Sequence, residues 1–134
     1  MTLGIVGSEA AKFTPSGESI ARTIIRALFD QHQPSQIISG ACHLGGIDIF
    51  AVEEARKMGL DVREFPPKTH AWGTGYRPRN VQIAKNSDHV VCITVDALPR
   101  SFTGMRFGQC YHCCIPGHVK SGGCWTVKYA KSIG

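Results

Sequence analysis

The residues best suited to chemistry form a cysteine- and histidine-rich cluster near the end of the chain. Four of them follow the pattern C-x2-C-x4-H-x5-C: Cys110, Cys113, His118 and Cys124. Two cysteines separated by two residues can hold one tetrahedral ion from a tight turn, and the other two residues complete its shell. We therefore predict a structural Zn²⁺ site, since four protein ligands leave no open position for a catalytic water. His112 and Cys114 are alternative ligands.

The chain has six cysteines, and nothing in MTLGIVGSEA at its start resembles a signal peptide. We therefore expect a cytoplasmic protein with reduced thiols, in which cysteines are buried, reactive or bound to metal. Cys92 lies in a predicted strand and is interpreted as a small buried hydrophobic residue. Cys42 lies in a glycine-rich loop, and we assign it no reactive role.

Small-residue turns form a second group of candidate site residues. Each follows a predicted strand or precedes a predicted helix, where backbone N–H groups can bind an anion such as a phosphate. One such turn is weak evidence, because glycine also serves any tight connection. Several turns that meet at the carboxyl edge of one sheet are stronger evidence. They are Gly7-Ser8, Ser39-Gly40-Ala41, Gly45-Gly46 before a helix that begins at Ile47-Asp48, and Ser121-Gly122-Gly123.

A long loop and the helix after it offer a cation and two aromatic rings. Arg79, followed by Asn80 at the predicted helix start, can hold a phosphate with two hydrogen bonds; the alternative is a helix-capping surface residue. Trp72 and Tyr76 can stack on a nucleobase. The alternative for Trp72 is that it anchors the loop to the domain.

The elements that must position these residues alternate along the chain. Short β-branched runs predict strands, and apolar residues at helical spacing predict helices between them. Short connections between alternating strands and helices indicate right-handed βαβ units, and hence an α/β fold with a mainly parallel sheet. The predicted strands cover 3–6, 36–39, 61–65 and 89–95, and the predicted helices cover 17–31, 47–58, 79–86 and 125–132.

Two loops interrupt this alternation, at 66–78 and 96–109. Long loops in small domains are often functional. With 134 residues, the chain is long enough for one domain with a proper core. We therefore predict a single domain at 1–134, in which 105–124 is a metal-binding insertion before the last helix.

The composition is that of an ordinary globular protein, with 43% hydrophobic and 19% charged residues. No apolar run approaches the roughly 20 residues of a membrane span, so no membrane partner is expected. The net charge of +5 is unevenly placed, because every acidic residue lies at or before Asp96. The basic end suits a partner that carries phosphate groups, although five cations are also compatible with a solvated surface.

The order of these motifs resembles that of the SLOG superfamily, a Rossmann-like group that includes DNA-processing (SMF/DprA) proteins and the LONELY GUY cytokinin-activating enzymes. The matching motifs span nearly the whole chain: GIVGS at 4–8, IISGAxxxGGID at 37–48, AxxxGL at 55–60, RPRN at 77–80, SDHVV at 87–91 and SGGCWTxxYA at 121–130.

The resemblance implies a three-layer α/β/α fold with about four strands in the order 3-2-1-4. It also implies a nucleotide or nucleotide-derived ligand at the carboxyl edge of the sheet. The site residues that it supports are Gly7, Ser8, Ser39, Gly40, Gly46, Asp48, Arg79, Asn80, Gly122, Gly123 and Thr126.

The chain also departs from the family pattern. The phosphoribohydrolase branch carries PGGxGTxxE with a catalytic glutamate, whereas this chain reads SGGCWTVKY and places Lys128 and Tyr129 there. This difference argues against cleavage of nucleoside monophosphates. A fifth strand after the last helix is missing, so we predict that a second copy covers the exposed sheet edge in a homodimer.

Three functions fit the sequence. The first is a nucleotide-binding module or sensor with zinc bracing the last turn. The second is an enzyme that acts on a nucleotide or nucleotide sugar, with Asp48, Glu53 or Asp96 as candidate acid or base. The third is a single-stranded nucleic-acid binding protein whose basic end works with Trp72 and Tyr76. We rank them in this order, because +5 is modest for a dedicated nucleic-acid binder.

Overall fold

The computed structural model describes residues 1–103, 110, 118–119 and 121–134. It is an α/β fold with one sheet of four parallel strands in the order β3-β2-β1-β4, as the sequence predicts. The strands are β1 (Thr2–Gly7), β2 (Gln36–Ser39), β3 (Asp61–Glu64) and β4 (His89–Ile93). The main helices are α1 (Pro15–His32), α2 (Ile47–Lys57), α3 (Arg77–Asn86) and α4 (Gly122–Ser132).

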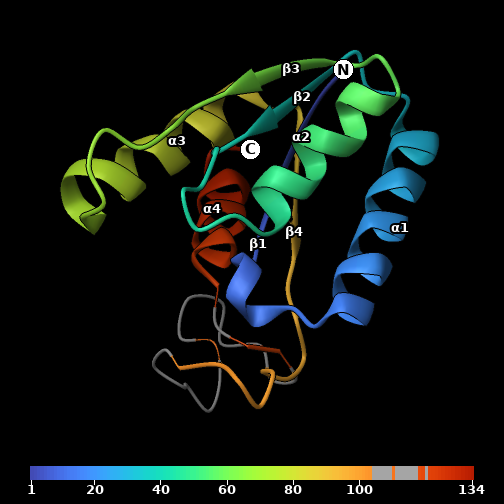
Figure 1. Ribbon diagram of the computed structural model, residues 1–134. Helices are drawn as coiled ribbons and strands as arrows, with labels where there is room; N and C mark the ends of the chain where they lie inside the picture. Colours follow the sequence, from blue (N-terminus) through green and yellow to red (C-terminus); the bar gives the residue numbers. More distant parts are fainter. Residues whose placement is uncertain (104–109, 111–117, 120) are drawn as a thin grey trace.

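The helices cover both faces of the sheet, which gives the three layers of a Rossmann-like fold (Figure 1). On one face, α1 and α2 bury Ile25, Phe29 and Phe50 against strand residues such as Leu3 and Ile5. On the other face, where α3 and α4 lie, a smaller core joins Val6, Ile38 and Ile83. Because both faces are covered, the central strands are apolar on both sides.

The N-termini of α1 and α4 are set by capping residues in the local sequence. Thr14 caps α1 by accepting the N–H of Gly17 at 3.1 Å, and Pro15 occupies the first turn, where no intrahelical donor is lost. Ser121 caps α4 in the same way through the N–H of Gly123, also at 3.1 Å. This cap starts α4 at Gly122, three residues before the predicted start at 125.

The loop predicted at 66–78 is partly helical. Trp72–Tyr76 form a π-helical turn that runs directly into α3. Gly75 makes this wide turn possible, because a Cβ atom at this position would collide with the backbone of Thr69. The turn places Trp72 and Tyr76 next to the carboxyl edge of the sheet.

The carboxyl ends of β1, β2 and β4 lie at this same edge, since the strands are parallel and in register. The edge strands of the described sheet are β3 and β4, so a homodimer through a sheet edge remains a prediction. Among the described residues, no helix combines the length and apolar character needed to cross a membrane. The predicted insertion at 105–124 lies largely outside the described residues.

Candidate functional site

The turn after β2 is held together by its own side chains. The Ser39 hydroxyl donates to the backbone carbonyl of Asp48 at 2.9 Å and accepts the N–H of Ala41 at 3.2 Å. Ala41 has a positive φ of 47°, a conformation that L-residues seldom adopt. The predicted site residues Ser39 and Ala41 therefore shape the turn, and the Ser39 hydroxyl is already engaged there.

Two predicted site residues, Asp48 and Arg79, form a buried pair at the sheet edge. Asp48 is 6% exposed and Arg79 is 7% exposed, and 3.8 Å separates Asp48 Oδ2 from Arg79 Nη1. Asp48 Oδ2 also accepts the N–H of Cys42 at 3.2 Å. Gly40 lies against the guanidinium, where any Cβ atom would collide with it. Gly40 thus makes room for Arg79.

The guanidinium of Arg79 is largely engaged by the protein itself. Its Nε donates to Asn80 Oδ1 at 2.8 Å, and its Nη1 donates to the carbonyl of Gly40. The sequence predicts that Arg79 binds a phosphate through two hydrogen bonds. In the structure Nε is engaged by Asn80 of α3 and Nη1 by the turn after β2, so among the described residues Nη2 is the nitrogen left for a ligand.

Asp48 is the titratable group whose environment is most unusual at this edge. Burial raises its pKa to about 6, although the charge of Arg79 and the N–H of Cys42 act in the opposite direction. Burial also raises the pKa of the Cys42 thiol, which favours its protonated form. Asp48 can therefore exchange a proton near neutral pH, whereas an ordinary aspartate cannot.

We expect Asp48 to make the folded state less stable as pH rises from about 4 to about 6. In this range the folded protein keeps a proton that the unfolded chain has lost, so the free energy of unfolding falls with pH. A pKa of about 6 against an ordinary 3.8 corresponds to about 3 kcal/mol. Urea unfolding of the wild type and Asp48→Asn across pH 4 to 8 measures this difference.

Asp88 provides a control in which the pKa is shifted in the opposite direction. Two hydrogen bonds from Thr2 lower the pKa of this exposed carboxyl, so its contribution to stability is lost as pH falls. Asp88→Asn should therefore leave the decline between pH 4 and pH 6 in place. If the Asp48→Asn and wild-type curves run parallel over this range, Asp48 does not titrate as expected.

The first turn of α4 approaches β1 closely. A Cβ atom at Gly123 would lie 3.0 Å from the N atom of Gly7, so glycine allows this contact. Nearby, the hydroxyl groups of Ser8 and Thr126 are buried and have no hydrogen-bond partner among the described residues. Buried hydroxyls without partners are rare and often mark the position of a ligand or an ordered water.

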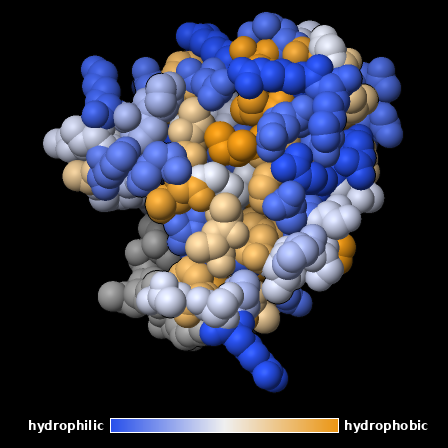
Figure 2. All heavy atoms as spheres, viewed as in Figure 1, coloured by the Kyte–Doolittle hydropathy of each residue, from blue (hydrophilic) through white to orange (hydrophobic). Residues whose placement is uncertain are grey.

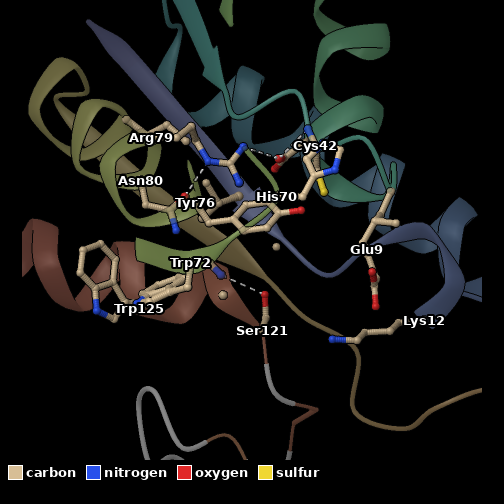
Figure 3. Close-up of a pocket in the computed structure, with 17 residues that line it drawn as sticks. Glu9, Lys12, Cys42, His70, Trp72, Tyr76, Arg79, Asn80, Ser121 and Trp125 are labelled. Atoms are coloured by element: carbon tan, nitrogen blue, oxygen red, sulfur yellow. Dashed lines mark hydrogen bonds and ion pairs between the residues drawn. The ribbon is translucent and has the colours of Figure 1, made fainter. Parts of the chain in front are cut away.

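A pocket of about 730 Å³ opens between these elements. Hydrophobic side chains gather in a band along the middle of the face seen in Figure 2. Trp72 and Trp125 lie at one end of the pocket, and Glu9 and Lys12 lie at the other (Figure 3). The predicted site residues that line it are Gly7, Asp48, Trp72, Tyr76, Arg79, Asn80, Ser121, Gly122 and Gly123.

The remaining predicted residues lie around the pocket without lining it. Gly45 and Gly46 adopt positive φ in the turn before α2, and the N–H of Ile47 donates to the carbonyl of Ser8 at 3.0 Å. These glycines support the wall of the site. The full set outside the lining is Ser8, Ser39, Gly40, Ala41, Gly45, Gly46 and Thr126.

Sequence analysis missed several residues of the pocket. Glu9 directly follows the Gly7-Ser8 strand end, and this position alone was a signal that it would reach the sheet edge. Lys12, His70 and Trp125 reach the pocket only through the way their segments fold, which no local pattern indicates. The lining residues not predicted as site residues are Val6, Glu9, Lys12, Cys42, Leu44, His70, Ile83 and Trp125.

Aromatic side chains form two groups at the pocket. The rings of His43 and His70 stack with centroids 3.7 Å apart, and the Tyr76 hydroxyl lies 3.2 Å from His43 Nδ1. Trp72 meets Trp125 edge to face at 5.3 Å. Trp72 is 41% exposed, so part of its ring is open to a binding partner.

Only one of the three predicted acid or base candidates lines the pocket, and that residue is Asp48. Glu53 is exposed and pairs with Arg22 at 2.9 Å between α1 and α2, whereas Asp96 is exposed after β4. Glu9 takes a place that sequence analysis did not foresee. The pocket therefore has two carboxyl groups, Asp48 and Glu9.

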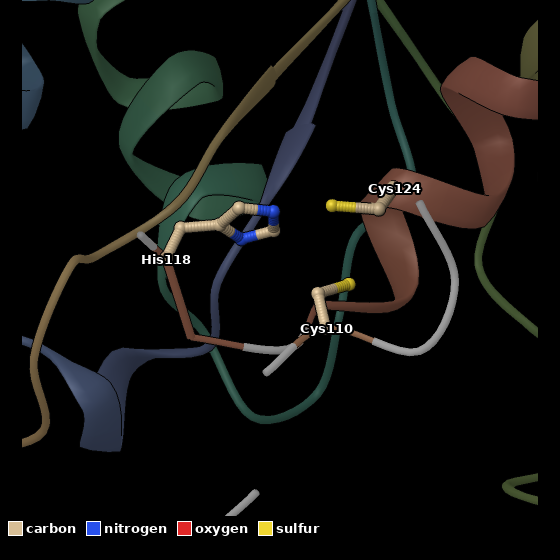
Figure 4. A group of neighbouring side chains, drawn as sticks. All are labelled: Cys110, His118 and Cys124. Atoms are coloured by element: carbon tan, nitrogen blue, oxygen red, sulfur yellow. The ribbon is translucent and has the colours of Figure 1, made fainter. Parts of the chain in front are cut away.

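Three of the four predicted metal ligands come together at the first turn of α4. The ligand atoms of Cys110, His118 and Cys124 all lie within 4.8 Å of one another, and their side chains point toward a common centre (Figure 4). His118 Nδ1 lies 2.9 Å from the carbonyl of Val119, to which it can only donate, so Nε2 is the nitrogen that would bind a metal ion. This group could hold a metal ion.

The rest of the predicted metal shell lies outside the described residues. This applies to Cys113 and to the alternative ligands His112 and Cys114. A thiol from a distant part of the sequence lies near this group: Cys92 Sγ on β4 is 4.0 Å from Cys124 Sγ. Hydrogen bonding to Cys92 and burial both raise the pKa of the Cys124 thiol.

Comparison with known proteins assigns no family to the chain. No family model, curated protein or solved structure matches the chain. The resemblance to the SLOG superfamily therefore stays a prediction. What the site does must be argued from its own residues.

Proposed function

We propose that the protein binds a nucleotide or a nucleotide-derived ligand in the pocket at the carboxyl edge of its sheet. The observation that carries this proposal is the pairing of two kinds of surface in one pocket. Trp72 and Trp125 offer aromatic faces at one end, and the N-terminus of α4 offers a positive dipole and the backbone N–H of Gly122. A base and a phosphate need these two surfaces.

The size and chemistry of the pocket support the proposal. About 730 Å³ is within the usual range for small-molecule sites. Arg79 and Lys12 bring positive charge to the lining, and Asn80 adds an amide. The hydroxyls of Ser8 and Thr126 have no hydrogen-bond partner among the described residues and lie next in sequence to lining residues, so an ordered water beside a bound ligand would satisfy them.

We also infer that Cys110, His118 and Cys124 bind Zn²⁺ as a structural ion. Two buried thiols and an imidazole whose second nitrogen is fixed by a carbonyl suit Zn²⁺ better than a harder ion. Cys124 follows Gly123 directly, so the ion would fix the turn that faces the ligand. The C-x2-C spacing predicts Cys113 as a fourth ligand, but this residue lies outside the described residues.

Calorimetry with a panel of nucleosides, nucleotides, cyclic nucleotides, nucleotide sugars and inorganic phosphate tests the main proposal. We expect a phosphorylated nucleoside to bind, and we expect Trp72→Ala to weaken it about 10-fold or more, since base stacking contributes about 1–3 kcal/mol. Met58→Ala removes an equally exposed apolar side chain away from the pocket and should change nothing. If no compound binds and nothing co-purifies in native mass spectrometry, the proposal is wrong.

A second candidate is an enzyme that acts on the same ligand. It is favoured by the two carboxyl groups in the pocket, because one can donate a proton while the other accepts one. The pKa of about 6 at Asp48 suits this task near neutral pH. Incubation of the panel with wild type and with Asp48→Asn, followed by product analysis, separates a binding module from an enzyme.

Single-stranded oligonucleotides complete the panel. A nucleic-acid binder would prefer them to mononucleotides, and its affinity would fall steeply as salt is added. Tighter binding of mononucleotides with a shallow salt response favours the pocket instead.

A further inference from the structure

Cys92 of β4 is the described thiol nearest to the metal-binding group of Cys110, His118 and Cys124. We propose that Cys92 is the fourth ligand of the ion, so that the shell is Cys3His and one of its members comes from the sheet. This inference rests on the proposed zinc site and is independent of the nucleotide. It replaces the interpretation of Cys92 as a plain hydrophobic residue.

The first argument is distance. Two thiolates that share a tetrahedral Zn²⁺ with bonds of about 2.3 Å lie about 3.8 Å apart. Cys92 Sγ and Cys124 Sγ are 4.0 Å apart. Cys92 does not belong to the group whose ligand atoms all lie within 4.8 Å of one another, so its sulfur must turn toward Cys110 and His118. Rotation about its Cα–Cβ bond is a side-chain change that leaves the strand in place.

The second argument is that the backbone brings the four residues to one point. The N–H of Val119, next to His118, donates to the carbonyl of Val95 at 2.8 Å, which ties that segment to the chain just after β4. On the other side, a Cβ atom at Gly123 would lie 2.8 Å from Cys92 Sγ. Glycine there admits the sulfur between β4 and the first turn of α4.

The third argument is chemical. Cys92 is half-buried on a rigid strand, and strands position metal ligands more precisely than loops do. A thiol within 4.0 Å of an ion-bound thiolate would otherwise remain as a weak S–H donor beside a charged centre. As a ligand it would join β4 to α4 through the ion. Cys113, the ligand nominated by spacing, would make no such link to the sheet.

The experiment compares three serine variants of the full chain: Cys92→Ser, Cys113→Ser and, as a control in the pocket, Cys42→Ser. Zinc content is measured by mass spectrometry and zinc affinity by competition with a chelator. We expect Cys92→Ser to bind zinc at least about 100-fold more weakly, because one of four ligands is lost. We expect Cys113→Ser and Cys42→Ser to bind as the wild type does. In Co²⁺-loaded protein, the thiolate-to-metal absorption should drop from that of three sulfurs to that of two in Cys92→Ser alone.

Melting temperatures separate loss of a ligand from damage to the strand. With excess chelator, any difference between Cys92→Ser and wild type reports the packing of Cys92 against Val6 and Ile38, and added zinc should then raise the melting temperature of the wild type only. An equal rise of the melting temperature with zinc in Cys92→Ser and in wild type would overturn the proposal. Loss of zinc from Cys113→Ser with retention in Cys92→Ser would also overturn it. A wild type without any zinc affinity removes the zinc site itself and leaves the nucleotide proposal intact.

Discussion

Replacement of Gly46 by alanine should lower the free energy of unfolding by about 3–5 kcal/mol, whereas the same change at Gly59 should lower it by about 1 kcal/mol. The two glycines share a positive φ, of 83° at Gly46 and 72° at Gly59, but the ψ of −144° at Gly46 lies outside the left-handed helical region. They also differ in what surrounds them. The difference between the two variants therefore reports the collision of the added methyl group together with the extra backbone strain at Gly46.

Gly46 lies against backbone that cannot move aside. A Cβ atom there would come closer than 3.0 Å to atoms of Ser8, Glu9 and Ala10, all of them main-chain. Two hydrogen bonds join the same segments: Ile47 N–H to the Ser8 carbonyl at 3.0 Å, and Ala10 N–H to the Leu44 carbonyl at 3.3 Å. An added methyl group must push these segments apart and weaken both bonds.

Gly59 ends α2 in open space, with nothing within 4 Å of its Cβ position. Its substitution therefore reports the cost of the left-handed backbone alone. Urea unfolding of the two variants, supported by thermal melts, measures the difference. Equal destabilisation of the two variants would mean that the turn before α2 does not pack against residues 8–10 as described.

The fold is largely readable from sequence, because its elements depend on local patterns. The run Leu3 to Val6 and the apolar periodicity of α1 and α2 each specify their element without reference to the rest of the chain. Alternation of these elements then leaves few topologies, and the parallel order 3-2-1-4 is among them. Local preference and global architecture agree here, so sequence reasoning succeeds.

The pocket is less predictable from sequence, because its lining depends on contacts between distant segments. Two glycines and two prolines between 66 and 78 indicate an irregular loop. The π-helical turn at Trp72–Tyr76 requires glycine at position 75, because a Cβ atom there would collide with the backbone of Thr69. Arg79 was expected to face a ligand, yet its Nη1 reaches the carbonyl of Gly40, 39 residues away in sequence.

Cys92 shows the same limit for the metal site. Spacing in sequence identifies candidate ligands that share one segment, as Cys110, His118 and Cys124 do. It cannot identify the ligand that we propose on a strand 32 residues away, whose thiol is brought to Cys124 by the packing of α4 on β4. Motif-based prediction of a metal shell therefore finds the local ligands first and misses those that the tertiary fold supplies.

Replacement of Arg79 by methionine should lower the free energy of unfolding by about 3–5 kcal/mol. The change keeps an apolar stem of similar shape and removes the guanidinium from a site where Arg79 is 7% exposed. It leaves the buried carboxyl of Asp48 without its cation, and the Gly40 carbonyl and Asn80 Oδ1 without their donor. Arg77→Met, on the exposed side of the same helix, should change stability by no more than about 0.5 kcal/mol.

Asp48→Asn in the Arg79→Met background tests whether the uncompensated charge is the cause. If it is, the double variant should be more stable than the sum of the single changes predicts, by about 1–3 kcal/mol. The pH dependence gives a second check. Without the arginine, the pKa of Asp48 should lie above the value of about 6 that it has beside Arg79, so the decline of stability with pH should extend to higher pH.

Arg79→Lys distinguishes the charge of the arginine from its shape. Lysine keeps a positive charge near Asp48 but lacks the planar fork that reaches Asn80 and Gly40 together. We expect its stability to lie between that of wild type and Arg79→Met, and its pH profile to stay close to wild type. Since Nη2 is the nitrogen left for a ligand, nucleotide affinity should fall in both variants. If Arg79→Met is no less stable than Arg77→Met, the pair of Arg79 and Asp48 does not hold the turn after β2, and the pocket must be organised by other contacts.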